Sequence, residues 1–231
     1  RSQTGGVDFI SVGGAATLPY SIPNLRVEYT EYDPGIPYGF WRSVGNSVNG
    51  YVTEAFFDEL AAAGGQDPYE LRRTLLAGHP RHKAALELVA EKAGWGSTPP
   101  AGRHRGISVH EAFGSIIGLV VELSIATNGT PRVHRVWCSV DCGWTINPDT
   151  IVAQMEGGIV YGLTAALMGE ITIDKGRVEQ RNFNDYQAMR LRDMPEIEVH
   201  IVPSTETPGG IGEPSTAGIA GALANAVYAA T

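Results

Sequence analysis

A single carboxylate stands among small residues in the stretch "PGGIGEPSTAG" near the C-terminus. Glu213 follows Gly209, Gly210 and Gly212 and precedes Pro214, and an apolar helix is expected directly after it. The glycines and the proline can form a turn at a helix start, the glycines can cradle a phosphate, or Glu213 can act as a general base. Pro214 lacks the amide that a phosphate cradle needs, which disfavours the second interpretation. The residues alone do not decide between the other two.

Two more polar residues lie beside glycines. Arg42 is in "GFWRSVG", a loop whose aromatic residues and glycines indicate a shaped pocket, and the alternative is an ordinary surface arginine. Gln154 is in "AQMEGG", on an expected helix, and the alternative is an ordinary glutamine on a helix surface. Glycines allow a ligand or another backbone to approach closely. Arg42, Gln154, Gly212 and Glu213 are therefore the candidate site residues.

The composition argues against several classes of protein. Of 231 residues, 43% are hydrophobic and 18% are charged, the net charge is −8, and the sequence has no basic stripe of the kind that binds nucleic acid. The densest basic run, 103–105, is expected to be a solvated turn. No apolar stretch has the ~20 residues that a membrane-spanning helix needs. Residues 1–20 lack a signal peptide, and the compartment is left open between cytoplasm and periplasm.

The two cysteines, Cys138 and Cys142, do not form a metal-binding pattern. Three residues separate them and the six histidines are scattered, so we expect two buried thiols and no metal ligand from the protein.

The first part of the chain is expected to be mainly helical. Residues 24–32 are expected to form a strand. Periodic apolar residues between turn and capping signals then predict three helices, at 51–63, 67–78 and 80–94. The stretch 94–102 is rich in glycine and proline and is the best internal boundary. We therefore expect one segment at 1–102, with the arginine loop and the helices, and another at 103–231, with the Gly-x-Gly-Glu-Pro motif.

The second segment mixes strands and helices. Strands are expected at 105–113, 115–126, 131–141 and 196–202. Asn128-Gly129 predicts a two-residue hairpin turn, and a second hairpin is expected around 174–176. Helices are expected at 147–170 and from Pro214 to about Ala230. The fold class is therefore α+β, with helices and β-hairpin sheets mixed along the chain.

Several stretches, taken in order, resemble the molybdenum hydroxylases, the xanthine dehydrogenase/aldehyde oxidase superfamily. They are "FWRSVGNSVNGYVTEAFFDELAAAGGQDPYELRRTLL", "DCGWTINPDTIVAQMEGGIVYGL", "NFNDYQAMRLRDMPEIEVHIV" and "PGGIGEPSTAGIAGALANAVYAA". The branch with the greatest likeness is the isoquinoline 1-oxidoreductase β-subunit type, which is grouped with aldehyde dehydrogenases. The likeness covers roughly residues 30–231.

This resemblance implies a role for each candidate residue. Glu213 matches the family's catalytic base, Gln154 a glutamine that contacts the molybdopterin cofactor, and Arg42 an arginine near the molybdenum. Gly212, in the same motif as Glu213, is expected at the cofactor. In this family the pterin sulfurs hold the metal. The family hydroxylates a carbon of an aldehyde or N-heterocycle with oxygen from water, and its cofactor is expected here in the cytosine dinucleotide form.

The resemblance also implies partners. Other pterin-binding stretches of the family are missing, so we expect this chain to be the C-terminal part of a molybdopterin-binding large subunit. It would work with the rest of that subunit and with a [2Fe–2S] subunit that accepts the electrons. The alternative is a non-catalytic structural or assembly chain in which "GGIGEP" is only a helix-start turn. A hydrolase that uses Glu213 would need a second placed acid or a nucleophile, and the sequence shows neither.

Overall fold

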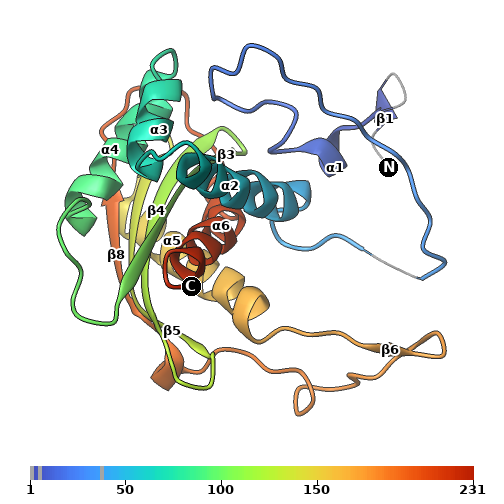
Figure 1. Cartoon of the computed structure of the whole chain (residues 1–231). Coiled ribbons are helices and arrows are strands. Elements are labelled where there is room, and N and C mark those ends of the chain that lie inside the picture. The colour runs from blue at the N-terminus through green and yellow to red at the C-terminus, as the bar shows by residue number, and fades with distance from the viewer. Residues whose placement is uncertain (1–2, 5–6, 37–38) are drawn as a thin grey trace.

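The computed structural model describes residues 3–4, 7–36 and 39–231. A four-stranded sheet forms the core of the fold, with helices packed against it (Figure 1). Three strands run antiparallel in chain order, and a fourth joins the edge of the sheet parallel to the third. In sheet order the strands are β3 (His104–Ala112), β4 (Ser115–Ile125), β5 (Pro131–Asp141) and β8 (Glu196–Ile201). The predicted α+β class and the four predicted strands are confirmed.

Helices cover both faces of this sheet (Figure 1). One face packs against α5 (Pro148–Leu167) and α6 (Pro214–Tyr228), and the other packs against α4 (Pro80–Ala93). Ile117, Leu119 and Val121 of β4 face the first layer, whereas Ile116 and Val120 face the second. Because both of its faces are buried, β4 has a continuous apolar run at 116–121 without polar alternation.

The helices of the first half pack onto this core. They are α2 (Gly45–Ala63), α3 (Pro68–Leu75) and α4, and α2 lies across α6. Asp67 caps α3 through the amides of Tyr69 and Glu70, and Asn147 caps α5 through the amide of Thr150, as polar residues before a proline predict. Contacts between helices and sheet cross residue 102, and the division into two segments there stays a prediction.

A buried ionic network ties α2 to α3 and β3. The Glu54 carboxylate accepts hydrogen bonds from Tyr20 Oη at 2.7 Å, from Arg72 Nε at 2.9 Å and from the Val109 amide at 3.0 Å. Arg72 is fully buried and also donates to Asp58. Because each buried charge has a partner, the network fixes α2 against the sheet without leaving a charge uncompensated.

Three local expectations were wrong. Residues 24–32 form no strand, and Leu25 and Val27 are exposed, because this stretch pairs with no other strand in the described part of the chain. The run 103–105 is no solvated turn, since it enters β3 and its two arginines pair with the buried Glu122. The loop between β4 and β5 is one residue longer than predicted, because Ala126 donates to the Thr130 carbonyl across 127–129.

The remaining elements are short and peripheral. They are β1 (Gln3–Thr4), β2 (Val7–Asp8), α1 (Phe9–Val12), β6 (Ile173–Asp174), β7 (Arg177–Val178) and a 3₁₀ turn, η1 (Leu191–Asp193). The β6–β7 hairpin confirms the prediction around 174–176 and lies at the end of an arm that extends away from the sheet (Figure 1).

Candidate cofactor-binding and catalytic site

Three segments that are far apart in the sequence meet at the N-terminus of α6. Arg42 Nε donates to the Gly212 carbonyl at 2.9 Å, and Nη2 donates to the same oxygen. Arg42 Nη2 also lies 3.4 Å from Gln154 Oε1 on α5. The three residues predicted to bind a cofactor therefore form one cluster, although 112 and 170 positions separate Arg42 from its two partners.

Glu213 directly precedes the first residue of α6, Pro214, but its side chain does not cap the helix. Its side chain makes no hydrogen bond to the α6 amides. Instead, Glu213 Oε1 accepts a hydrogen bond of 2.8 Å from the Ser43 amide, and the Ser43 hydroxyl donates to the Glu213 carbonyl at 3.1 Å. The carboxylate is therefore directed to the Arg42 loop, beside the cluster of predicted cofactor-binding residues.

Sequence reasoning missed Ser43. It is fully buried, and nothing about a serine after Arg42 distinguishes it in the sequence. Its φ is +76° and that of Val44 is +43°, in the left-handed region that residues with a side chain rarely adopt. Such backbone strain persists only where surrounding contacts hold it, and it concentrates at functional sites.

Aromatic rings lie beside the arginine. Trp41 and Tyr161 have ring centroids 5.3 Å apart, and the Arg42 guanidinium lies 5.5 Å from the centre of the Tyr161 ring. Of the two aromatic residues in the loop, Phe40 is 80% exposed, and the second ring at this place is Tyr161 of α5, which was not predicted. The ring face attracts the cation and helps to hold the guanidinium toward Gly212.

Residues 84–195 match the family model of the molybdopterin cofactor-binding domain. The isoquinoline 1-oxidoreductase subunit beta of Brevundimonas diminuta is 30% identical over 219 residues, which are 93% of this chain and 28% of the relative. The membrane-bound aldehyde dehydrogenase (pyrroloquinoline-quinone) of Gluconacetobacter polyoxogenes is 30% identical over 216 residues, 82% of this chain and 27% of the relative. This chain belongs to the molybdenum hydroxylase superfamily. Its relatives are oxidoreductases and dehydrogenases, as the resemblance implied.

Solved structures of molybdenum hydroxylases share the fold. The aldehyde oxidoreductase of Desulfovibrio desulfuricans superimposes with a TM-score of 0.64 at 12% identity, over 82% of this chain and 39% of that one. At this identity the likeness concerns the fold alone. The chain spans less than a third of the length of the two curated relatives.

The residues at the site of this molybdenum hydroxylase chain are compatible with a bulky cofactor. A Cβ on Gly212, or on Gly157 one turn along α5 from Gln154, would meet no atom within 4 Å. By contrast, Gly158 faces α6, where a Cβ would overlap Ser215. The glycine pair after Gln154 therefore has two roles, because one member packs the helices and the other leaves space beside the candidate residues. Among the described residues, no group of three His, Cys, Asp or Glu side chains could hold a metal ion.

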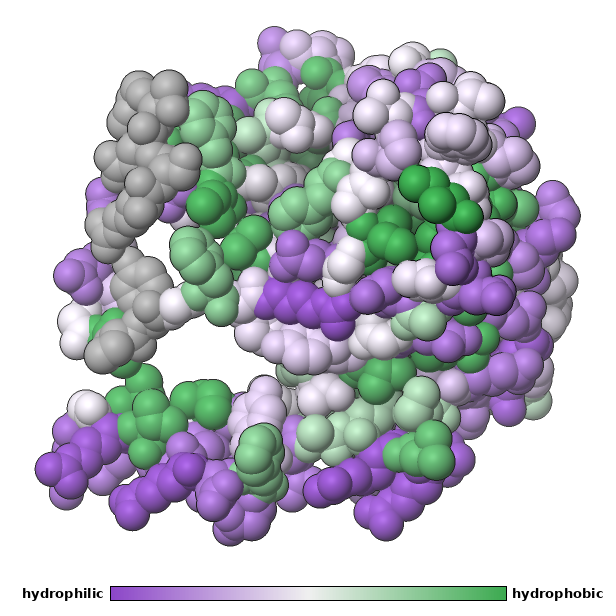
Figure 2. All heavy atoms as spheres, turned by 180° about the vertical axis from the view of Figure 1, so that it is seen from behind, coloured by the Kyte–Doolittle hydropathy of each residue, from purple (hydrophilic) through white to green (hydrophobic). Residues whose placement is uncertain are grey.

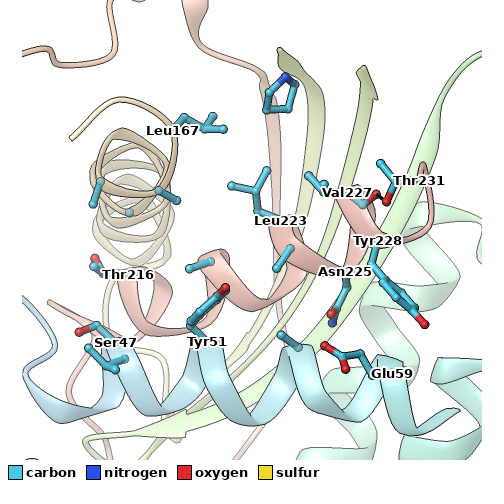
Figure 3. Close-up of a pocket in the computed structure, with 18 of the residues that line it drawn as sticks. Ser47, Tyr51, Glu59, Leu167, Thr216, Leu223, Asn225, Val227, Tyr228 and Thr231 are labelled. Carbon is cyan, nitrogen blue, oxygen red and sulfur yellow. Dashed lines mark hydrogen bonds between the residues drawn. The ribbon is translucent and has the colours of Figure 1, made fainter. Parts of the chain in front are cut away.

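Two hollows flank the Arg42 loop. One, of about 710 Å³, lies between α2, α5 and α6 and is shown in Figure 3, where Glu59 of α2 and Asn225 of α6 point toward each other. The other, of about 1090 Å³, lies between this loop and residues 29–36. Trp41 lines both hollows, whereas Glu213 lines neither. The candidate base therefore lies beside these hollows and not at the centre of one.

Both cysteines are buried free thiols, as predicted. Burial raises the pKa of the Cys138 thiol to about 12, which leaves it un-ionised and unreactive at neutral pH. No helix in the described ranges combines the length and the apolar character needed to cross a membrane.

Proposed function

We propose that this chain forms part of a molybdenum hydroxylase that binds molybdopterin in the cytosine dinucleotide form. The enzyme hydroxylates a carbon of an aldehyde or an N-heterocycle with oxygen from water, and Glu213 is the base. One observation carries the proposal: Arg42, Gln154 and Gly212 converge beside the Glu213 carboxylate from three distant segments. A helix-start turn needs only the glycines and the proline, and it does not require this convergence.

The residues of this chain bind the cofactor and move a proton. When bound, the molybdenum cofactor supplies the two-electron oxidation. The Gln154 amide can both donate and accept hydrogen bonds, which suits the mixed donor and acceptor edge of a pterin. Arg42 adds a fixed positive charge that already anchors the Gly212 carbonyl. The absence of a side chain at Gly212 lets the cofactor approach the backbone.

Glu213 is arranged to accept a proton. Oε1 is held by the Ser43 amide, whereas Oε2 accepts no hydrogen bond within the described ranges and can take the proton. In the overall reaction one C–H bond breaks and one C–O bond forms with an oxygen of water, and two electrons and two protons leave. A positioned base typically contributes ~10²–10⁴-fold to the rate.

We also propose that the chain works with the rest of a molybdopterin-binding large subunit and with a [2Fe–2S] subunit. Four apolar side chains at helical spacing on α2 are exposed: Val48, Val52, Phe56 and Leu60. The arm that carries β6 and β7 stands away from the body in Figure 2, and on it Phe183 is 91% exposed. Large exposed apolar patches mark interaction surfaces. An obligate interface of more than ~2,000 Å² fits these surfaces.

The test uses the purified complex. Elemental analysis should find molybdenum, and extraction should find no pyrroloquinoline quinone, the group named for one relative. Turnover of isoquinoline in ¹⁸O-labelled water should place the label in the product. Sedimentation should show this chain bound to a longer one. An active, soluble monomer of this chain alone, or a fully active complex without molybdenum, would refute the proposal.

A further inference from the structure

The Arg42 loop and the Gly-x-Gly-Glu-Pro motif are joined residue by residue. The Arg42 side chain donates to the Gly212 carbonyl, and both the amide and the hydroxyl of Ser43 donate to Glu213. Ser43 therefore contacts the carboxylate and the backbone of the same residue. With Oε1 held at one end and the carbonyl at the other, the Glu213 side chain cannot turn freely about its bonds.

The turn that presents Ser43 is strained and is held from two sides. On one side, the Val44 amide donates to the Trp41 carbonyl at 2.9 Å. On the other side, the Ser47 hydroxyl in the first turn of α2 donates to the Val44 carbonyl at 2.7 Å. Positive φ is costly for a β-branched residue such as Val44. Glycine would avoid this cost, but positions 43 and 44 hold serine and valine. The turn is therefore stiff, and its strain lowers the stability of the fold.

We propose that Ser43 is a positioning residue, which holds the Glu213 carboxylate in one orientation so that Oε2 is left to accept the proton. The inference rests on the proposed function, because it takes Glu213 as the base. A catalytic group misplaced by about 1 Å can cost 10²-fold in rate. The strained turn prevents such a misplacement, because it fixes the amide and the hydroxyl of Ser43, which both donate to Glu213.

The experiment uses the complete, molybdenum-loaded enzyme with isoquinoline or benzaldehyde, whichever the wild type oxidises. Ser43→Gly adopts φ of +76° without strain. It removes the side chain that donates to the Glu213 carbonyl, and it keeps the amide that donates to Oε1 but leaves the turn more flexible. We expect kcat to fall about tenfold, with KM and molybdenum content unchanged. Val44→Gly keeps Ser43 but frees the turn, so kcat should fall while the thermal midpoint stays level or rises. A merely structural role would not lower kcat in a variant that is as stable as the wild type.

Thr53→Val is the matched control, because the Thr53 hydroxyl donates to a backbone carbonyl of α2 away from the site. It should leave kcat unchanged. The inference is overturned if Ser43→Gly keeps kcat within twofold of the wild type while Glu213→Gln has lost turnover. It is also overturned if kcat falls only together with molybdenum content or the thermal midpoint. If Glu213→Gln itself keeps turnover, the proposed function fails and not only the role of Ser43.

Discussion

Gly221→Ala should destabilise the protein, because Gly221 lies where α6 crosses α2. A Cβ there would lie 2.8 Å from Glu54 Cβ and 3.3 Å from the Gly50 carbonyl oxygen. Carbon atoms normally approach to about 3.5–4.0 Å, so the two helices must separate by roughly 1 Å. Glu54 cannot move away cheaply, because three hydrogen bonds hold its buried carboxylate. Overpacking of this kind costs about 1–3 kcal/mol.

Part of this cost is offset, since alanine is favoured over glycine within a helix by up to about 1 kcal/mol. We therefore expect a net loss of up to about 2 kcal/mol in the free energy of unfolding of Gly221→Ala. Gly157→Ala is the matched control, because its Cβ meets nothing within 4 Å and should stabilise by up to about 1 kcal/mol. Urea denaturation of the purified protein measures both. If Gly221→Ala proves as stable as Gly157→Ala, α2 and α6 do not pack as closely as described.

Three further predictions follow from single side chains. Arg72→Met should cost about 3–5 kcal/mol in the free energy of unfolding, because it leaves two buried carboxylates unpaired, and a loss under 1 kcal/mol in urea denaturation would contradict this. Burial raises the pKa of Glu122, but hydrogen bonds from two arginines outweigh it and the pKa is lowered. This carboxylate therefore stabilises the fold above its unfolded pKa near 4.5, and the contribution is lost as the pH falls through the lower folded pKa. Glu122→Gln should accordingly lose stability at pH 7 and converge with the wild type in acid, which thermal unfolding across pH would show. Gln154→Leu should lower molybdenum occupancy in elemental analysis, and full occupancy with slow turnover would show that its role is not cofactor binding.

The elements were largely predictable because local signals mark them. A capping residue followed by proline marks the starts of α3 and α5, and the continuous apolar run of β4 fits a strand buried on both faces. The sequence was less informative where tertiary contacts determine the bounds of an element. Helix α2 begins at Gly45, six residues before the predicted start, because packing against α6 overrides the low helix propensity of "GNSVNG".

The site could be predicted only in part. Their residue types and neighbouring glycines made Arg42, Gln154 and Glu213 separate candidates. Only the resemblance to a family indicated that the three residues belong to one site. Their convergence depends on how α2, α5 and α6 pack, which no spacing in the sequence encodes. Ser43 gave no signal at all, since its contacts with Glu213 arise from a left-handed turn that a serine does not predict.

The central claim is that Glu213, besides standing at the start of α6, acts as a base. Its most direct test is the turnover of Glu213→Gln in the complete enzyme, with molybdenum content measured on the same sample. Glutamine keeps the shape and can still accept the Ser43 hydrogen bond, but it cannot take up the proton. Glu91→Gln makes the same chemical change at an exposed position of α4 and should leave turnover unchanged. We predict that Glu213→Gln loses at least ~10²-fold in kcat with full molybdenum content; turnover within about threefold of the wild type would contradict the account.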